Sequence, residues 1–241
     1  MNIKVNFKKQ VFSKYNANLI LFADEKFNIT GLKKHISNSE YSYISDILKK
    51  KDTKKRIVTF DISSKKKIIL VSIKKNLTDS DAENLGAKCY VILNELKETQ
   101  YIVNSDTIPN GLKNILGYFL HGIKLKSYKF EKYKTKKDKG DISINIIGKN
   151  IPNNKDQLKF SSIEKGTFYT RDLVSEPGNI LHPDEYAKRI KTLSKFGLKI
   201  KIYNEKELKK LGMNTLLGVG QGSIRGSYLV TMEWNGKKDK S

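Results

Sequence analysis

The sequence predicts an α/β fold, in which short strands alternate with amphipathic helices. Short apolar and β-branched runs recur along the chain and are typical of strands, whereas the segments between them place apolar residues three or four positions apart, as helices do. Apolar residues make up 38% of the 241 residues, which is enough to bury a core. Strands and helices joined by short connections favour layered α/β domains.

The chain begins with alternating apolar and polar residues. Ile3, Val5 and Phe7 alternate with polar neighbours, so residues 1–12 are predicted as a first strand and lack the apolar block of a signal peptide. No apolar run approaches the length that spans a bilayer. Further strands, rich in Ile, Leu and Val, are predicted over residues 18–23, 56–62, 67–73 and 101–103.

Helices are predicted between these strands, over residues 39–50 and, more strongly, over residues 79–98. Thr78 followed by Asp81 offers a capping pair at the start of the second helix. Pro109 is predicted to open a third helix, because proline suits a first helical position. Its apolar face comprises Leu112, Ile115, Leu116, Phe119, Leu120 and Ile123.

A candidate linker follows a further strand predicted over residues 142–147. Residues 148–154 contain Gly, Pro and three Asn, which favour a turn or loop, so we predict a boundary between a domain of residues 1–148 and a second part of residues 149–241.

The second part is predicted to begin with a helix over residues 155–175, ended by Glu176-Pro177-Gly178. Pro183 opens the next helix, which stops near Gly197. Its inward residues are predicted to be Tyr186, Ala187, Ile190 and Leu193. A strand over residues 198–203, a helix over residues 205–211 capped by Asn204, and a strand over residues 228–234 complete the pattern.

Spacing of reactive residue types indicates no catalytic, cofactor-binding or metal-binding constellation. His35, His121 and His182 lie far apart, and no paired-ligand motif occurs. His121 is predicted to lie on the surface, His182 to serve a turn or cap before Pro183, and Cys89 to lie in the core. The glycines of the LLGVGQGS segment, Gly218, Gly220 and Gly222, do not follow the strand–loop–helix pattern of a dinucleotide site.

The net charge of +22 raises nucleic-acid binding as an alternative. However, only Arg56, Arg171, Arg189 and Arg225 among 47 basic residues are arginine, the residue that reads nucleic acid best. A solvated surface with weak, nonspecific attraction to polyanions is therefore the preferred interpretation. The single cysteine fits a reducing compartment, and the cytoplasm is the expected location.

Several ordered motifs resemble the leucyl (cytosol) aminopeptidase family. Residues 170–179 (TRDLVSEPGN) and 211–223 (LGMNTLLGVGQGS) are similar to the patterns that open the family's catalytic domain, with Ser175 in place of the usual Asn and His182 in place of a common Thr. Residues 115–119 and 130–137 (FEKYKTKK) are similar to a stretch near the end of the family's N-terminal domain. The resemblance runs from about residue 40 onwards.

This resemblance implies a macrodomain-like N-terminal α/β domain followed by the first part of an α/β metallopeptidase domain. It also implies a homo-hexamer that removes N-terminal residues from peptides, with two divalent ions, Mn or Zn, activating a bridging water. The family's ligands are a Lys, three Asp and a Glu in motifs that do not occur here, so no metal or catalytic residue is assigned and this chain is expected to bind neither ion and to be inactive alone. Arg171, Asp172, Glu176 and Pro177 are expected to serve a turn and helix end.

We therefore expect the chain to be the front portion of such an enzyme. The alternative is a non-catalytic protein that uses the same domain for oligomerisation or for binding nucleic acid.

Overall fold

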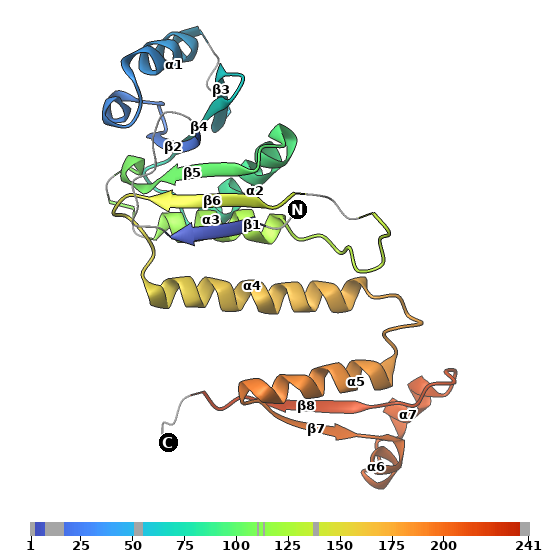
Figure 1. Cartoon of the computed structure of the whole chain (residues 1–241). Coiled ribbons are helices and arrows are strands. Elements are labelled where there is room, and N and C mark those ends of the chain that lie inside the picture. The colour runs from blue at the N-terminus through green and yellow to red at the C-terminus, as the bar shows by residue number, and fades with distance from the viewer. Residues whose placement is uncertain are drawn as a thin grey trace. The chain divides into compact units, whose positions relative to one another are not determined.

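The computed structural model describes residues 3–7, 17–50, 55–109, 111–112, 114–136 and 140–236. The chain divides into two compact units, residues 1–170 and 171–241, and each is described by itself (Figure 1).

The first unit is built on a six-stranded sheet in the order β1-β6-β5-β2-β4-β3. Neighbouring strands are parallel except for β3, which pairs antiparallel with β4. The strands are β1 (Ile3–Phe7), β2 (Asn18–Asp24), β3 (Ile57–Ser63), β4 (Lys66–Ile73), β5 (Gln100–Asn104) and β6 (Ile142–Ile147). Every strand predicted in this half is confirmed, although residues 8–12 of the first lie outside the described residues.

Helices cover both faces of this sheet, as the buried apolar runs of its central strands require. α2 (Asp79–Leu96) and α3 (Ile115–Lys126) pack on one face, where Phe22 and Val71 are among the buried sheet residues. α1 (Asn38–Lys50) and the 3-10 helix η1 (Thr30–Lys34) pack on the other, against Leu21 and Leu70. The mixed α/β fold is thus as predicted (Figure 1).

Helices α2 and α3 approach each other closely through two glycines. A methyl group at Gly86 would lie 1.9 Å from the carbonyl oxygen of Phe119, and one at Gly122 would lie 1.9 Å from the carbonyl oxygen of Glu83. Both contacts are with rigid backbone, so only glycine permits this crossing. The start of α2 is the predicted one, because Thr78 and Asp81 form a reciprocal capping box.

Two expectations about α3 are wrong. The helix begins at Ile115 and not at Pro109, because Asn114 adopts a left-handed conformation with φ of 60° that a helix cannot include. His121 is buried, with 6% of its surface exposed, and does not lie on the surface. Its imidazole Nδ1 lies 2.7 Å from a carboxylate oxygen of Glu83 on α2, a partner that compensates for its burial.

The second unit begins within α4 (Asn154–Ser175), since the division between Thr170 and Arg171 falls inside this helix. The boundary at residues 148/149 stays a prediction. After α4 come α5 (Pro183–Lys191), the 3-10 helix η3 (Thr192–Phe196), β7 (Lys199–Tyr203), α6 (Glu205–Lys210), α7 (Asn214–Gly220) and β8 (Leu229–Glu233). β7 and β8 pair antiparallel in a two-stranded sheet.

Local signals predicted most of this second unit. Pro183 opens α5, Asn204 forms a capping box with Glu207, and Gly197 ends η3 in a left-handed conformation. Ala187 and Ile190 are buried as expected, whereas Tyr186 is 43% exposed and not inward. Among the described helices, none is long and apolar enough to cross a membrane.

We predict that Gly122→Ala destabilises the first unit by about 1–3 kcal/mol, because the added methyl group forces α2 and α3 apart. Gly166→Ala is the matched control: nothing lies within 4 Å of its methyl position in α4. That control should be neutral or stabilising by about 0.5–1 kcal/mol. Urea unfolding followed by circular dichroism measures both; equal midpoints for Gly122→Ala and the parent would contradict the crossing.

A second prediction concerns the buried ion pair between Lys66 and Glu40, whose charged atoms lie 2.6 Å apart. Burial, the largest single influence, raises the pKa of Glu40, but the hydrogen bonds from Lys66 and Ser37 and the charge of Lys66 together outweigh it and hold this pKa below its ordinary value of 4.5. The pair's stabilisation is therefore present above pH 4.5 and is lost as pH falls through the lower, folded-state pKa. Lys66→Met should cost about 3–5 kcal/mol at neutral pH.

Acid unfolding measured by circular dichroism tests this pair. The double variant Glu40→Gln/Lys66→Met leaves no uncompensated charge and should cost less than Lys66→Met alone. The stability of Glu40→Gln should fall less steeply at acid pH than that of the parent. An equal fall in both proteins would contradict the proposed role of the carboxylate.

Candidate functional site

The segment after α4 is held by an arginine that bridges two carboxylates. The Arg189 guanidinium of α5 donates to Glu176 at 2.8 Å, through Nη1, and to Glu185 at 3.0 Å, through Nε. These hydrogen bonds, with that to Glu176 the stronger influence, raise the pKa of Arg189. The Glu176 side chain is only 2% exposed. Glu176 thus ties the end of α4 to α5, whose apolar face carries Ala187 and Ile190.

His182 stands at the N-cap position of α5 but does not cap it with its side chain. Its Nδ1 instead pairs with the Asp184 carboxylate. Burial alone raises the pKa of Asp184, but the His182 hydrogen bond and the backbone outweigh it and lower that pKa. A carboxylate at the N-terminus of a helix is also favoured by the helix dipole. The predicted turn role of His182 fits this position.

The remaining residues singled out by the sequence are dispersed. Cys89 is fully buried on α2, and burial raises the pKa of its thiol to about 12, so it is not a nucleophile. His35 contacts the Asn104 amide at 2.9 Å, at the end of β5. Gly218 and Gly220 lie in α7 and Gly222 just after it, so the glycine segment is helical rather than a phosphate-binding loop.

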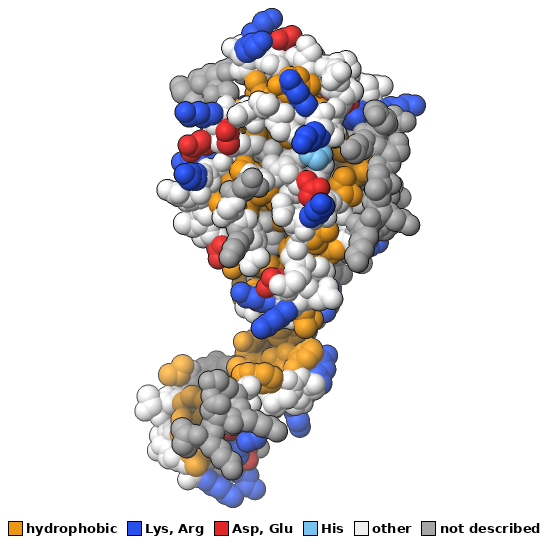
Figure 2. All heavy atoms as spheres, turned by 90° about the vertical axis from the view of Figure 1, so that its left-hand side faces the viewer, with side chains coloured by type: hydrophobic (Ala, Val, Ile, Leu, Met, Phe, Trp, Pro, Cys, Tyr) orange, Lys and Arg blue, Asp and Glu red, His pale blue; other side chains and the backbone are white. Residues whose placement is uncertain are grey.

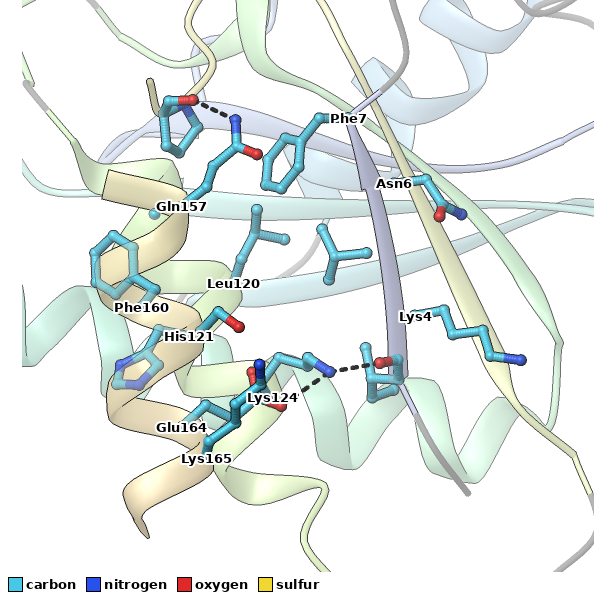
Figure 3. A pocket seen from close by; sticks show the side chains of 15 residues that line it. Lys4, Asn6, Phe7, Leu120, His121, Lys124, Gln157, Phe160, Glu164 and Lys165 are labelled. Atoms are coloured by element: carbon cyan, nitrogen blue, oxygen red, sulfur yellow. Dashed lines mark hydrogen bonds and ion pairs between the residues drawn. The ribbon is translucent and has the colours of Figure 1, made fainter. Parts of the chain in front are cut away.

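A cavity of about 460 Å³ lies in the first unit, between β1, α3 and α4 (Figure 3). Its walls include Phe7, Leu120, His121 and Phe160. The Nε2 atom of His121 is buried and has no hydrogen-bond partner, while its ring lies 5.2 Å from that of Phe160. Periodicity of apolar residues in α3 could not reveal this site, because the chain segments that form it are distant in sequence.

The described residues offer no metal centre. In that part of the chain, no three His, Cys, Asp or Glu side chains gather closely enough to hold an ion. The acidic residues near α5 have partners of their own: Arg189 engages Glu176 and Glu185, and His182 engages Asp184.

Comparison with known proteins connects the second unit to a peptidase family. The profile of the cytosol aminopeptidase family, catalytic domain, matches residues 168–241. A probable cytosol aminopeptidase of Phytoplasma mali is 35% identical over 182 residues, which cover 72% of this chain and 36% of that protein. This chain thus spans about a third of that relative's length.

Solved structures share the fold of the whole chain. A tomato leucine aminopeptidase mutant superposes with a TM-score of 0.78 and 16% identity, covering 99% of this chain and 52% of that one. A bottromycin maturation enzyme, BotP, in complex with Mn superposes with a TM-score of 0.68 and 15% identity, covering 91% of this chain and 45% of that one. At this level of identity the likeness establishes the fold alone.

We predict that Arg189→Met loosens the second unit by about 1–3 kcal/mol, because the buried Glu176 carboxylate loses a charged hydrogen-bond donor. Lys188→Met is the matched control, since Lys188 is exposed on the same helix and belongs to no part of this network. Chymotrypsin digestion followed by mass spectrometry measures the effect as faster cleavage between residues 171 and 236. Equal cleavage rates for the two variants would show that the bridge does not stabilise this unit.

Proposed function

Because the chain belongs to the cytosol aminopeptidase family and spans part of its length, we propose that it is the N-terminal portion of an enzyme that removes N-terminal residues from peptides. The observation that carries this proposal is the family's catalytic-domain match over residues 168–241, placed after an α/β unit in a chain that superposes almost entirely on a leucine aminopeptidase. Sequence and fold both support an N-terminal α/β unit followed by the start of the catalytic domain.

In this proposal two divalent ions, held outside the described residues, would supply the chemistry. Such ions lower the pKa of a bound water and polarise a peptide carbonyl, as in other two-metal hydrolases. Manganese is supported by the BotP complex with Mn, and zinc is the alternative that the family resemblance implies. The ligand motifs that the family resemblance implies do not occur in this sequence, so the proposal includes a chain that is inactive alone.

Exposed apolar side chains on the second unit support the idea that more protein packs against it. Large apolar residues that are more than half exposed are Val174, Phe196, Leu211, Val219, Ile224, Met232 and Trp234. Exposed apolar patches mark contacts with other protein, and Figure 2 shows hydrophobic side chains at the surface of this unit. We assign this surface to the remainder of the catalytic domain, and a cytoplasmic homo-hexamer to the complete enzyme.

The face drawn in Figure 2 does not favour the nucleic-acid alternative. On the face drawn in Figure 2, Lys and Arg side chains of the first unit are scattered and interspersed with Asp and Glu. A dedicated nucleic-acid surface gathers its cations into a patch or stripe. We expect scattered lysines of this kind to give only weak attraction to polyanions at low salt.

We predict that the purified 241-residue chain does not hydrolyse leucine para-nitroanilide with added Mn²⁺ or Zn²⁺, and retains neither ion after gel filtration. Co-expression with a second polypeptide, the remainder of the Phytoplasma mali relative beyond its aligned region, should produce metal-dependent hydrolysis that EDTA abolishes. The second polypeptide expressed alone is the control. Hydrolysis by the chain alone, in preparations from a host lacking its own aminopeptidases, would refute its proposed dependence on further residues.

A further inference from the structure

Strand β1 ends the six-stranded sheet, and no strand among the described residues pairs with its outer side, which is therefore a free edge in that part of the chain. Ser143 of β6 donates its N–H to Thr99, on the β5 side, so Ile144 faces β1. Because successive residues of a strand point their backbone groups to opposite sides, Ile3, Val5 and Phe7 direct their N–H and C=O groups away from β6. The Ile3 carbonyl confirms this direction, since it accepts a hydrogen bond of 2.7 Å from the Lys124 ammonium of α3.

The cavity described above lies along this free edge. All five residues of β1 line it, and α3 and α4 form its other walls (Figure 3). Its volume of about 460 Å³ is in the usual range of ligand pockets, roughly 300–1,000 Å³. The side chains of Leu120 and Phe160 supply apolar surface, and Gln157 supplies a polar group near Phe7. The cavity therefore offers backbone hydrogen-bonding groups beside apolar surface.

A lysine at the rim of the cavity favours an anionic occupant. Lys4, Lys124 and Lys165 line the cavity together with Glu164. Lys4 is already engaged, because its ammonium lies 2.7 Å from the Asp141 carboxylate. Lys124 is already engaged, because its ammonium lies 3.0 Å from Glu164 as well as bonding Ile3. Lys165 is exposed on α4 at the rim, where it can meet a carboxylate from solvent.

We propose that this cavity binds a short extended peptide bearing an acidic residue, which adds as a strand to the free edge of β1. The peptide backbone would pair with the N–H and C=O of Val5, its apolar side chains would contact Leu120 and Phe160, and its carboxylate would lie near Lys165. Strand addition of this kind takes affinity from main-chain hydrogen bonds and specificity from flanking pockets. This proposal does not rest on the proposed peptidase function, so its failure would leave that function untouched.

The test is a titration of the ¹⁵N-labelled 241-residue chain with N-acetyl-Val-Thr-Val-Glu, followed by NMR. We expect saturable shifts in the amides of β1, with Val5 and Phe7 among the largest. The same peptide N-methylated at its two central amides cannot donate to the edge and should bind at least about fivefold more weakly.

The role of the lysine charge is tested with two variants that make the same Lys→Glu change at different positions of α4. Lys165→Glu should weaken binding about threefold to tenfold at low salt, and this loss should shrink as salt rises. Lys159→Glu makes the same change on the same helix, at an exposed residue that does not line the cavity, and should alter binding much less.

Three results would overturn the site: no saturable shift in β1, equal affinity for the N-methylated peptide, or equal effects of Lys165→Glu and Lys159→Glu. Because both variants alter exposed side chains and the N-methylated peptide is tested on the unaltered chain, none of these readings depends on a variant that fails to fold.

Discussion

The need to cover both faces of a mainly parallel sheet governs the architecture of the first unit. Its central strands, β2 and β4, are apolar on both sides, so each side must be sealed by helices. On one side α1 and η1 suffice. On the other, two helices share the surface, and α2 can lie against α3 only because Gly86 and Gly122 remove the side chains that would separate them. The buried histidine, the cavity beside β1 and the anchoring of the edge strand by Lys124 all follow from where this helix pair places α3.

Features encoded by neighbouring residues could be predicted from the sequence. The capping boxes at Thr78 and Asn204, and the proline that opens α5, are local signals whose energetics depend on three or four residues, and the structure confirms each. The central strands β2 and β4 were predictable for a similar reason, because a strand buried on both faces is a continuous apolar run, whereas β1 shows the alternation of apolar and polar residues.

Features that depend on distant partners could not be predicted in this way. The position of His121 lies off the main apolar stripe of its helix and predicts exposure, but Glu83, thirty-eight positions away, supplies the partner that allows its burial. Arg189 likewise binds Glu176, which lies just after α4. The proline signal at residue 109 does not set the start of α3, because the left-handed Asn114 overrides it. The family was recognisable only because its motifs are runs of adjacent residues, which the eye can match without any geometry.

The sealed position of Cys89 has a practical consequence. It is the chain's one thiol, it lies on the buried face of α2 with none of its surface exposed, and its thiolate is strongly disfavoured there. Alkylating reagents attack thiolates, so this sulfur can react only in molecules whose helix layer has lifted away from the sheet. The rate at which such a reagent labels the native protein therefore measures how often the first unit opens, and no engineered reporter is required.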